Sequence, residues 1–141
     1  FLLSAEKERI GVIDWEFAHY GSPVQDVAHL LSHLWMLGRL GSKKVGREWA
    51  AAFANAYDEA VGSHAGWGSE IPYLHIHGAS EIAMRLGGAY SGGYPMERAS
   101  SAVRREALKR SFALLEEARR LLEGPDKLSY SITPFFKMMF A

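Results

Sequence analysis

The feature that most limits the fold is a long segment with the spacing of an amphipathic helix. Between Met96 and Leu122, apolar residues recur every three or four positions and form one stripe, made of Val103, Ala107, Leu108, Leu114, Leu115, Ala118, Leu121 and Leu122. Gly124 and Pro125 follow and supply a stop signal, because glycine ends helices readily and proline cannot continue them. We expect one helix here, with paired charges such as Glu116 and Arg120 on its solvated face.

Three earlier segments show the same helical spacing. They run from about Pro23 to Leu37, from about Lys44 to Val61 and from about Ile71 to Leu86. At the start of the first, Ser22 suits an N-cap, Pro23 suits the first turn and Gln25 completes a capping box. In the second, the residues expected on the packed face are Trp49, Phe53, Ala56, Tyr57 and Ala60. The third has Pro72 in its first turn and ends before a glycine-rich connection.

Strand signals occur only at the start of the chain. Residues 1–3 are apolar, residues 4–8 are polar and residues 9–15 are rich in β-formers, which predicts a hairpin with Asp14 at its exit. The apolar end of the tail, residues 134–140, is too short to cross a bilayer, so we expect it to dock on the domain. The predicted fold class is α+β, mostly α. It comprises a hairpin over residues 1–17, a helical subdomain over 22–124 and an apolar tail over 125–141.

Composition excludes several classes of partner. Sixteen basic residues balance sixteen acidic ones, so no overall charge favours nucleic acid or an anionic membrane. No apolar run approaches the roughly 20 residues that span a membrane. The chain has no cysteine, which excludes disulfides and thiolate chemistry and fits a reducing compartment. We therefore expect a cytoplasmic protein with no nucleic-acid or membrane partner.

The segment from Ile10 to Ala28 carries the most specific pattern. It contains Val12-Ile13-Asp14-Trp15-Glu16-Phe17, then Gly21-Ser22-Pro23 and Asp26-Val27-Ala28. An acid at the exit of an apolar strand is held rigidly enough to bind a hard cation such as Mg²⁺, although turn and cap aspartates occupy similar positions. The whole pattern resembles the metal-binding signature of the aminoglycoside phosphotransferases and choline kinases, which share the protein-kinase-like fold. Ser22 stands where many relatives have aspartate.

The resemblance implies a role for three acids. Asp14 would hold Mg²⁺ that bridges the phosphates of ATP, and Glu16 would assist the metal directly or through water. An exposed glutamate at a strand end is the alternative for Glu16. Asp26 would brace the catalytic loop by hydrogen bonds, or would be a first-turn acid favoured by the helix dipole. The implied reaction transfers the γ-phosphate of ATP to a hydroxyl of a small acceptor molecule.

The catalytic loop of that family, H-x-D-x-x-x-x-N, does not occur in this sequence. It would lie immediately before residues 1–3, and the chain opens on Phe1 rather than Met. We therefore expect the C-terminal part of a phosphotransferase that is cut from a larger protein, inactive alone and without a catalytic residue of its own. The alternative is a non-catalytic, kinase-derived helical module that binds partners through its apolar face and tail. Exposure of a face that another lobe covers would favour self-association.

Several histidines are further candidates for a metal site. His75 and His77 with Glu81 offer zinc ligands, but core or acceptor-cleft histidines are the preferred interpretation. His29 and His33 are four residues apart and, with His19, raise the same question; a satisfied pair on a helix face is preferred there.

The acceptor molecule would lie between the metal site and the helical subdomain. Its candidate walls are acidic and aromatic: Asp58, Glu59, Glu70, Glu81, Trp35, Trp67 and Tyr73. The basic run around Arg104 and Arg105 is interrupted by glutamates, so a solvated helix face is preferred to a nucleic-acid interface.

Overall fold

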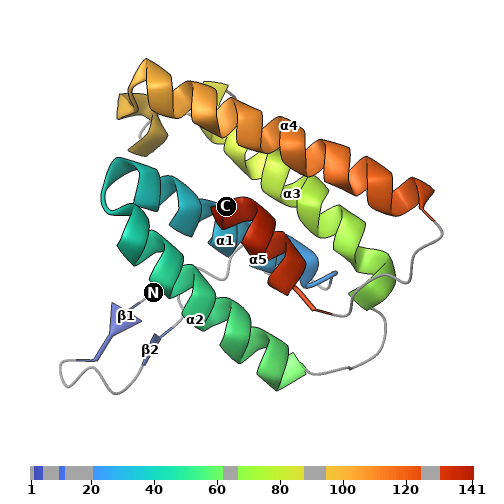
Figure 1. The fold of residues 1–141 in the computed structure, drawn as a ribbon. Helices are drawn as coiled ribbons and strands as arrows, with labels where there is room; N and C mark the ends of the chain where they lie inside the picture. Colours follow the sequence, from blue (N-terminus) through green and yellow to red (C-terminus); the bar gives the residue numbers. More distant parts are fainter. Residues whose placement is uncertain (1, 5–9, 12–20, 62–66, 88–94, 125–130) are drawn as a thin grey trace.

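The computed structural model describes residues 2–4, 10–11, 21–61, 67–87, 95–124 and 131–141. These residues are mostly helical, as predicted (Figure 1). The helices are α1 (Val24–Leu40), α2 (Lys43–Val61), α3 (Trp67–Gly87), the short 3-10 helix η1 (Pro95–Arg98), α4 (Ser101–Glu123) and α5 (Thr133–Phe140). Within those ranges, no helix combines the length and the hydropathy needed to cross a bilayer.

Two short strands lie at the start of the chain. Strand β1 (Leu2–Leu3) pairs antiparallel with β2 (Ile10–Gly11), and Leu2 lies opposite Gly11. The rest of the segment predicted as a hairpin, including residues 12–17, lies outside the described residues. Two residue pairs do not establish that hairpin, so it and the kinase-like fold stay predictions.

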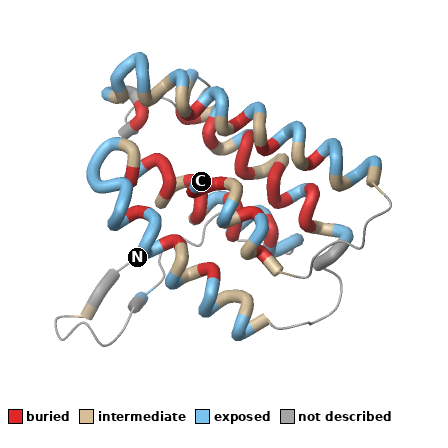
Figure 2. The backbone as a smooth tube through the Cα atoms, in the orientation of Figure 1, coloured by how far each residue is buried: buried red, intermediate tan, exposed pale blue. Residues whose placement is uncertain are grey.

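The four long helices pack in the order α4, α3, α1, α2, and α5 lies across α1 and α2 (Figure 1). Buried residues lie on the faces that these helices turn toward one another (Figure 2). The largest fully buried side chains include Leu31 and Trp35 of α1, Leu74 and Ile82 of α3, and Phe135 of α5. Helix α1 is thus the central element, because it contacts α2, α3 and α5.

Helix α2 packs through small residues together with part of the aromatic face that its sequence predicts. Its buried residues are Gly46, Ala50 and Ala54. Of the predicted face, Phe53 and Tyr57 are partly buried and pack against the core, as expected. The prediction is wrong for Trp49, which is 62% exposed, and for Ala56 and Ala60, which are also exposed. Small side chains occupy the contact because α1 approaches too closely for larger ones.

The closest approach of α1 and α2 is at a pair of glycines. A Cβ atom placed on Gly46 would lie 2.8 Å from the Cα of Gly38 and 2.8 Å from the carbonyl oxygen of Leu34. Real Cβ atoms do not come that close to backbone atoms, so only glycine at position 46 fits this crossing.

The segment predicted as one helix from Met96 to Leu122 is divided in two. It forms η1, and α4 then begins after Ser100, whose side-chain oxygen accepts a hydrogen bond from the N–H of Val103 at 3.3 Å. Serine is a favoured N-cap because this bond satisfies an amide that has no partner within the helix. Gly124 follows the last residue of α4, as expected.

Only part of the predicted apolar stripe of α4 is buried. Ala107, Leu114 and Ala118 are buried, whereas Leu108, Leu115 and Leu122 are between 43% and 56% exposed. The reason is that α4 packs mainly against one neighbour, α3, so a single narrow line of residues is covered.

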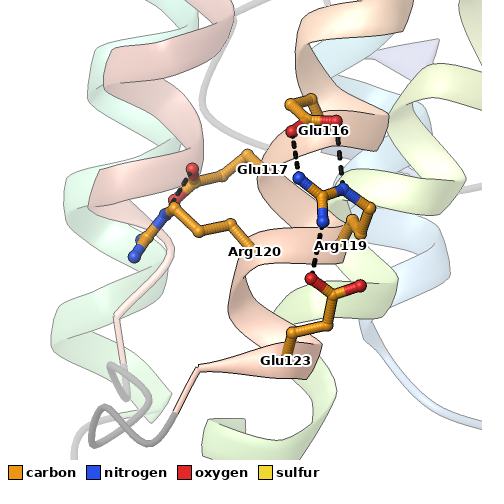
Figure 3. Close-up of polar contacts among 5 residues, drawn as sticks. All are labelled: Glu116, Glu117, Arg119, Arg120 and Glu123. Carbon is orange, nitrogen blue, oxygen red and sulfur yellow. Dashed lines mark hydrogen bonds and ion pairs between the residues drawn. The ribbon is translucent and has the colours of Figure 1, made fainter.

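The charged face of α4 is solvated and paired, as predicted, but with different partners (Figure 3). Arg119 donates to Glu116 and to Glu123, and Arg120 donates to Glu117. Glu116 is therefore paired with Arg119 rather than with Arg120. Exposed pairs of this kind contribute little each to stability.

The C-terminal tail docks on the domain, as predicted. Phe135 and Met139 of α5 are fully buried. The residues at the start of α5 are bound to the carboxylate of Asp58 on α2. This carboxylate accepts hydrogen bonds from the hydroxyls of Ser131 and Thr133 and from the N–H of Ile132. The distances are 2.5, 2.8 and 2.9 Å, respectively. One acid on α2 thus holds the start of the last helix.

Candidate functional site

The start of α1 largely agrees with its prediction, whereas the start of α3 does not. Pro23, directly before the first residue of α1, has the helical angles φ −67° and ψ −11°, as expected of a first-turn proline. The Ser22 hydroxyl accepts from the N–H of Val24 at 3.4 Å, as a capping side chain does, and it also donates to Glu70 Oε2 on α3 at 2.6 Å. Helix α3 begins at Trp67, so Pro72 lies inside the helix rather than in its first turn. The beginnings of α1 and α3 are therefore joined by a side-chain hydrogen bond.

Asp26 lies in the first turn of α1 and is exposed. Burial, followed by the negative charges of Asp26 and Asp58, raises the pKa of Tyr57 on α2. Among the described residues, none forms a hydrogen bond with this carboxylate. The other two predicted acids, Asp14 and Glu16, lie outside the described residues.

A cluster of titratable side chains lies between α1 and α3, which we call the His-His-Glu cluster: His29, His33 and Glu81. His29 Nδ1 lies 3.2 Å from Glu81 Oε1, and His33 Nε2 lies 3.4 Å from Glu81 Oε2. The two imidazole rings stack with their centroids 4.3 Å apart. Glu81 Oε2 also lies 3.4 Å from a guanidinium nitrogen of Arg85.

The electrostatics of the cluster favour an ionised carboxylate. Hydrogen bonds from His29 and His33 hold the pKa of Glu81 far below its usual range, and the charge of Arg85 acts in the same direction. Burial opposes this shift but is outweighed. Glu81 therefore carries a negative charge at neutral pH, 14% exposed, between two helices.

The seven predicted walls of the acceptor site do not share one role. Trp35 is 1% exposed and belongs to the core, so its prediction as a wall is wrong. Asp58 holds the tail, Glu70 binds Ser22 and Glu81 belongs to the His-His-Glu cluster. The remaining described walls, Glu59 and Tyr73, are exposed, and nothing is described for the side chain of Trp67.

The preferred interpretation of His75 as a core residue is confirmed. It is 1% exposed, and its Nδ1 lies 2.9 Å from the carbonyl oxygen of Ile71. Its ring meets that of Phe135 edge-on, with centroids 5.1 Å apart. Burial lowers the pKa of His75, which favours the neutral imidazole. His75 is thus not a member of the cluster that contains Glu81.

A family model described as the phosphotransferase enzyme family matches residues 1–72, just over half of the 141-residue chain. The chain belongs to this phosphotransferase family. The match covers the segment with Asp14, Glu16 and Asp26, all of α1 and α2, and the start of α3. No curated protein and no solved structure matches the chain. The family indicates a kinase-like phosphotransferase.

Sequence reasoning missed the convergence of the His-His-Glu cluster. The spacing of His29 and His33 was a visible signal, since residues four apart share a helix face. The third member, Glu81, comes from a different helix, and only the packing of α3 on α1 brings it to the two imidazoles. His77, which precedes Glu81 by one helical turn, is not in the cluster.

Proposed function

We propose that this chain forms the C-terminal part of an ATP-dependent phosphotransferase that phosphorylates a hydroxyl of a small molecule. The observation that carries the proposal is the family match over residues 1–72, which includes the acid-bearing segment and the first two helices. In this role Asp14 holds Mg²⁺, Glu16 supports the metal and Asp26 braces the catalytic loop. No residue of the printed sequence is assigned as the catalytic base, because it contains no H-x-D-x-x-x-x-N.

The donor set supports magnesium at the acid-bearing segment. Asp14 and Glu16 offer carboxylate oxygens, which are the ligands that Mg²⁺ prefers, and Mg²⁺ bound there would neutralise charge on the phosphates of ATP. The group of described residues that could hold a metal ion, the His-His-Glu cluster, offers two imidazole nitrogens and suits a softer ion. The magnesium role therefore stays with Asp14 and Glu16.

The position of Asp26 supports its role as a brace. Its carboxylate is exposed in the first turn of a helix whose other face is buried in the core. A rigid helix end is a suitable base from which an acid can accept hydrogen bonds from a loop, and the helix dipole stabilises the negative charge there. Asp26 acts in this proposal by positioning the loop, not by touching the substrate.

Metal–nucleotide binding tests the proposal. Mn²⁺ replaces Mg²⁺, and its free concentration is followed by electron paramagnetic resonance in the presence of ATP. We expect Asp14→Asn to weaken binding at least tenfold, since even residues behind a metal ligand change affinity by about 10–100-fold. Glu48→Gln is the control, because Glu48 is an exposed acid that pairs with Lys44. Equal binding by Asp14→Asn and the unsubstituted chain would refute the metal role of Asp14.

A second candidate is the non-catalytic binding module, with self-association as one form of it. The observation that favours it is the exposed apolar line on α4, formed by Leu108, Phe112, Leu115 and Leu122. The tail cannot contribute as first expected, because Phe135 and Met139 are buried within this chain. In the same titration, metal–nucleotide binding that is lost in Asp14→Asn favours the phosphotransferase over the binding module.

A further inference from the structure

We propose that His29 and His33 of α1 and Glu81 of α3 bind a zinc ion that links the two helices. Each residue offers one ligand atom, and the three atoms lie within 4.8 Å of one another. Two imidazoles four residues apart on a helix, with a carboxylate from a second element, are a common zinc-binding set. This site is separate from the proposed magnesium site and does not depend on it.

The two nitrogen–oxygen distances are close to the ligand spacing of a tetrahedral ion, and they join the two imidazoles to different oxygens of Glu81. With zinc–nitrogen and zinc–oxygen bonds of about 2.0–2.2 Å, two ligand atoms of a tetrahedron are about 3.4 Å apart. His29 Nδ1 and Glu81 Oε1 are separated by 3.2 Å, and His33 Nε2 and Glu81 Oε2 by 3.4 Å.

The surroundings fix the carboxylate without closing the site. Arg85, 7% exposed, lies 3.4 Å from Glu81 Oε2 and is a charged partner of that oxygen. Partners of this kind behind a metal ligand are usual in zinc sites. His29 is 49% exposed, so an ion can enter from solvent on that side and keep a water as its fourth ligand.

The alternative to this proposal is a cluster without metal, in which Glu81 simply pairs with His29, His33 and Arg85. Direct titration with zinc distinguishes the two, because the pairing alternative predicts no zinc binding that depends on His29 and His33.

The test is calorimetric titration of the metal-free chain with Zn²⁺ at neutral pH. We expect His29→Ala and His33→Ala each to weaken zinc binding by at least about 100-fold, since both are direct ligands. His77→Ala is the matched control, because His77 lies one turn before Glu81 on α3 but outside the cluster, and it should bind as the unsubstituted chain does. Co²⁺ in place of zinc should give the visible absorption of a four-coordinate ion, which His29→Ala abolishes.

Three results would overturn the proposal. They are failure of the unsubstituted chain to bind Zn²⁺, unchanged binding by His29→Ala, and equal losses in His77→Ala and His29→Ala. Folding of each variant is checked by far-ultraviolet circular dichroism. Because His29 is half exposed, its replacement by alanine should leave the fold intact. None of these results depends on ATP or on Asp14, so the zinc site and the proposed function can fail separately.

Discussion

Replacement of Gly46 by alanine tests the close packing of α1 on α2. The added Cβ would meet the Cα of Gly38 and the carbonyl oxygen of Leu34, each at 2.8 Å. Both are backbone atoms, so neither can rotate away as the end of a flexible side chain would. The two helices would have to separate, which opens space between neighbouring small residues such as Ala50.

The magnitude follows from two opposing effects. Overpacking a buried site costs about 1–3 kcal/mol, and contact with backbone on both sides places this site at the upper end, about 3 kcal/mol. Alanine is favoured over glycine within a helix by about 1 kcal/mol, which offsets part of the cost. The net effect on the free energy of unfolding is a loss of about 2 kcal/mol. For a chain of this size, that lowers the melting temperature by about 6–8 °C.

Urea unfolding followed by circular dichroism measures this loss. Gly87→Ala is the control, because a Cβ on Gly87, at the end of α3, would meet no atom within 4 Å. Helix propensity then acts alone, so Gly87→Ala should be neutral or more stable by up to about 1 kcal/mol. If Gly46→Ala were as stable as Gly87→Ala, the close crossing of α1 and α2 would be wrong.

Two further predictions concern partly buried acids, Asp58 and Glu81. Asp58→Asn should lower the free energy of unfolding by about 2 kcal/mol, because one carboxylate accepts three hydrogen bonds at the start of α5. The amides of α5 should exchange hydrogen faster in Asp58→Asn than in the control variant Glu59→Gln. Equal exchange of these amides in both variants would contradict the prediction. Glu81→Gln should reduce the loss of stability in acid. The depressed pKa of Glu81 stabilises the folded chain above the usual carboxyl value of about 4.3, and this stability is lost as pH falls toward the folded value. Parallel urea midpoints for Glu81→Gln and the unsubstituted chain across acid pH would show that His29, His33 and Arg85 do not perturb this carboxyl.

The helices could be predicted from the sequence because their spacing and stop signals are local. Helix α2 begins one residue before the predicted Lys44 and ends at the predicted Val61, and Gly124 follows the end of α4 as expected. The break before α4 was missed, since apolar spacing continues through it and only the cap of Ser100 marks the new start. The packed face of α2 was predicted only in part. Phe53 and Tyr57 pack against the core as expected, but the closest contact is made by small residues, because α1 approaches α2 there. That approach is a property of two helices together.

The candidate site also has one part that could be predicted from the sequence and one part that could not. Asp14, Glu16 and Asp26 could be proposed from a contiguous segment, because a family signature is a local pattern. The His-His-Glu cluster could not, because its members are separated by about half the length of the helical region and meet only when α3 packs on α1. The spacing of the two histidines indicates a shared face but not what lies opposite it.

Helix α1 is fixed to its neighbours at three points along its length, and these contacts determine how Asp26 in its first turn is positioned. Ser22 binds Glu70 before the helix begins, the His-His-Glu cluster joins its middle to α3, and Gly38 meets Gly46 of α2 near its end. The family match ends at residue 72, so Glu81 and all of α4 and α5 lie beyond it. The unmatched part nevertheless packs directly on matched elements, through α3 on α1 and through α5 on the Asp58 carboxylate of α2. Since α1 carries Asp26, the residues beyond the match fix the orientation of an acid within it, and a change in that packing would reach the proposed site through α1.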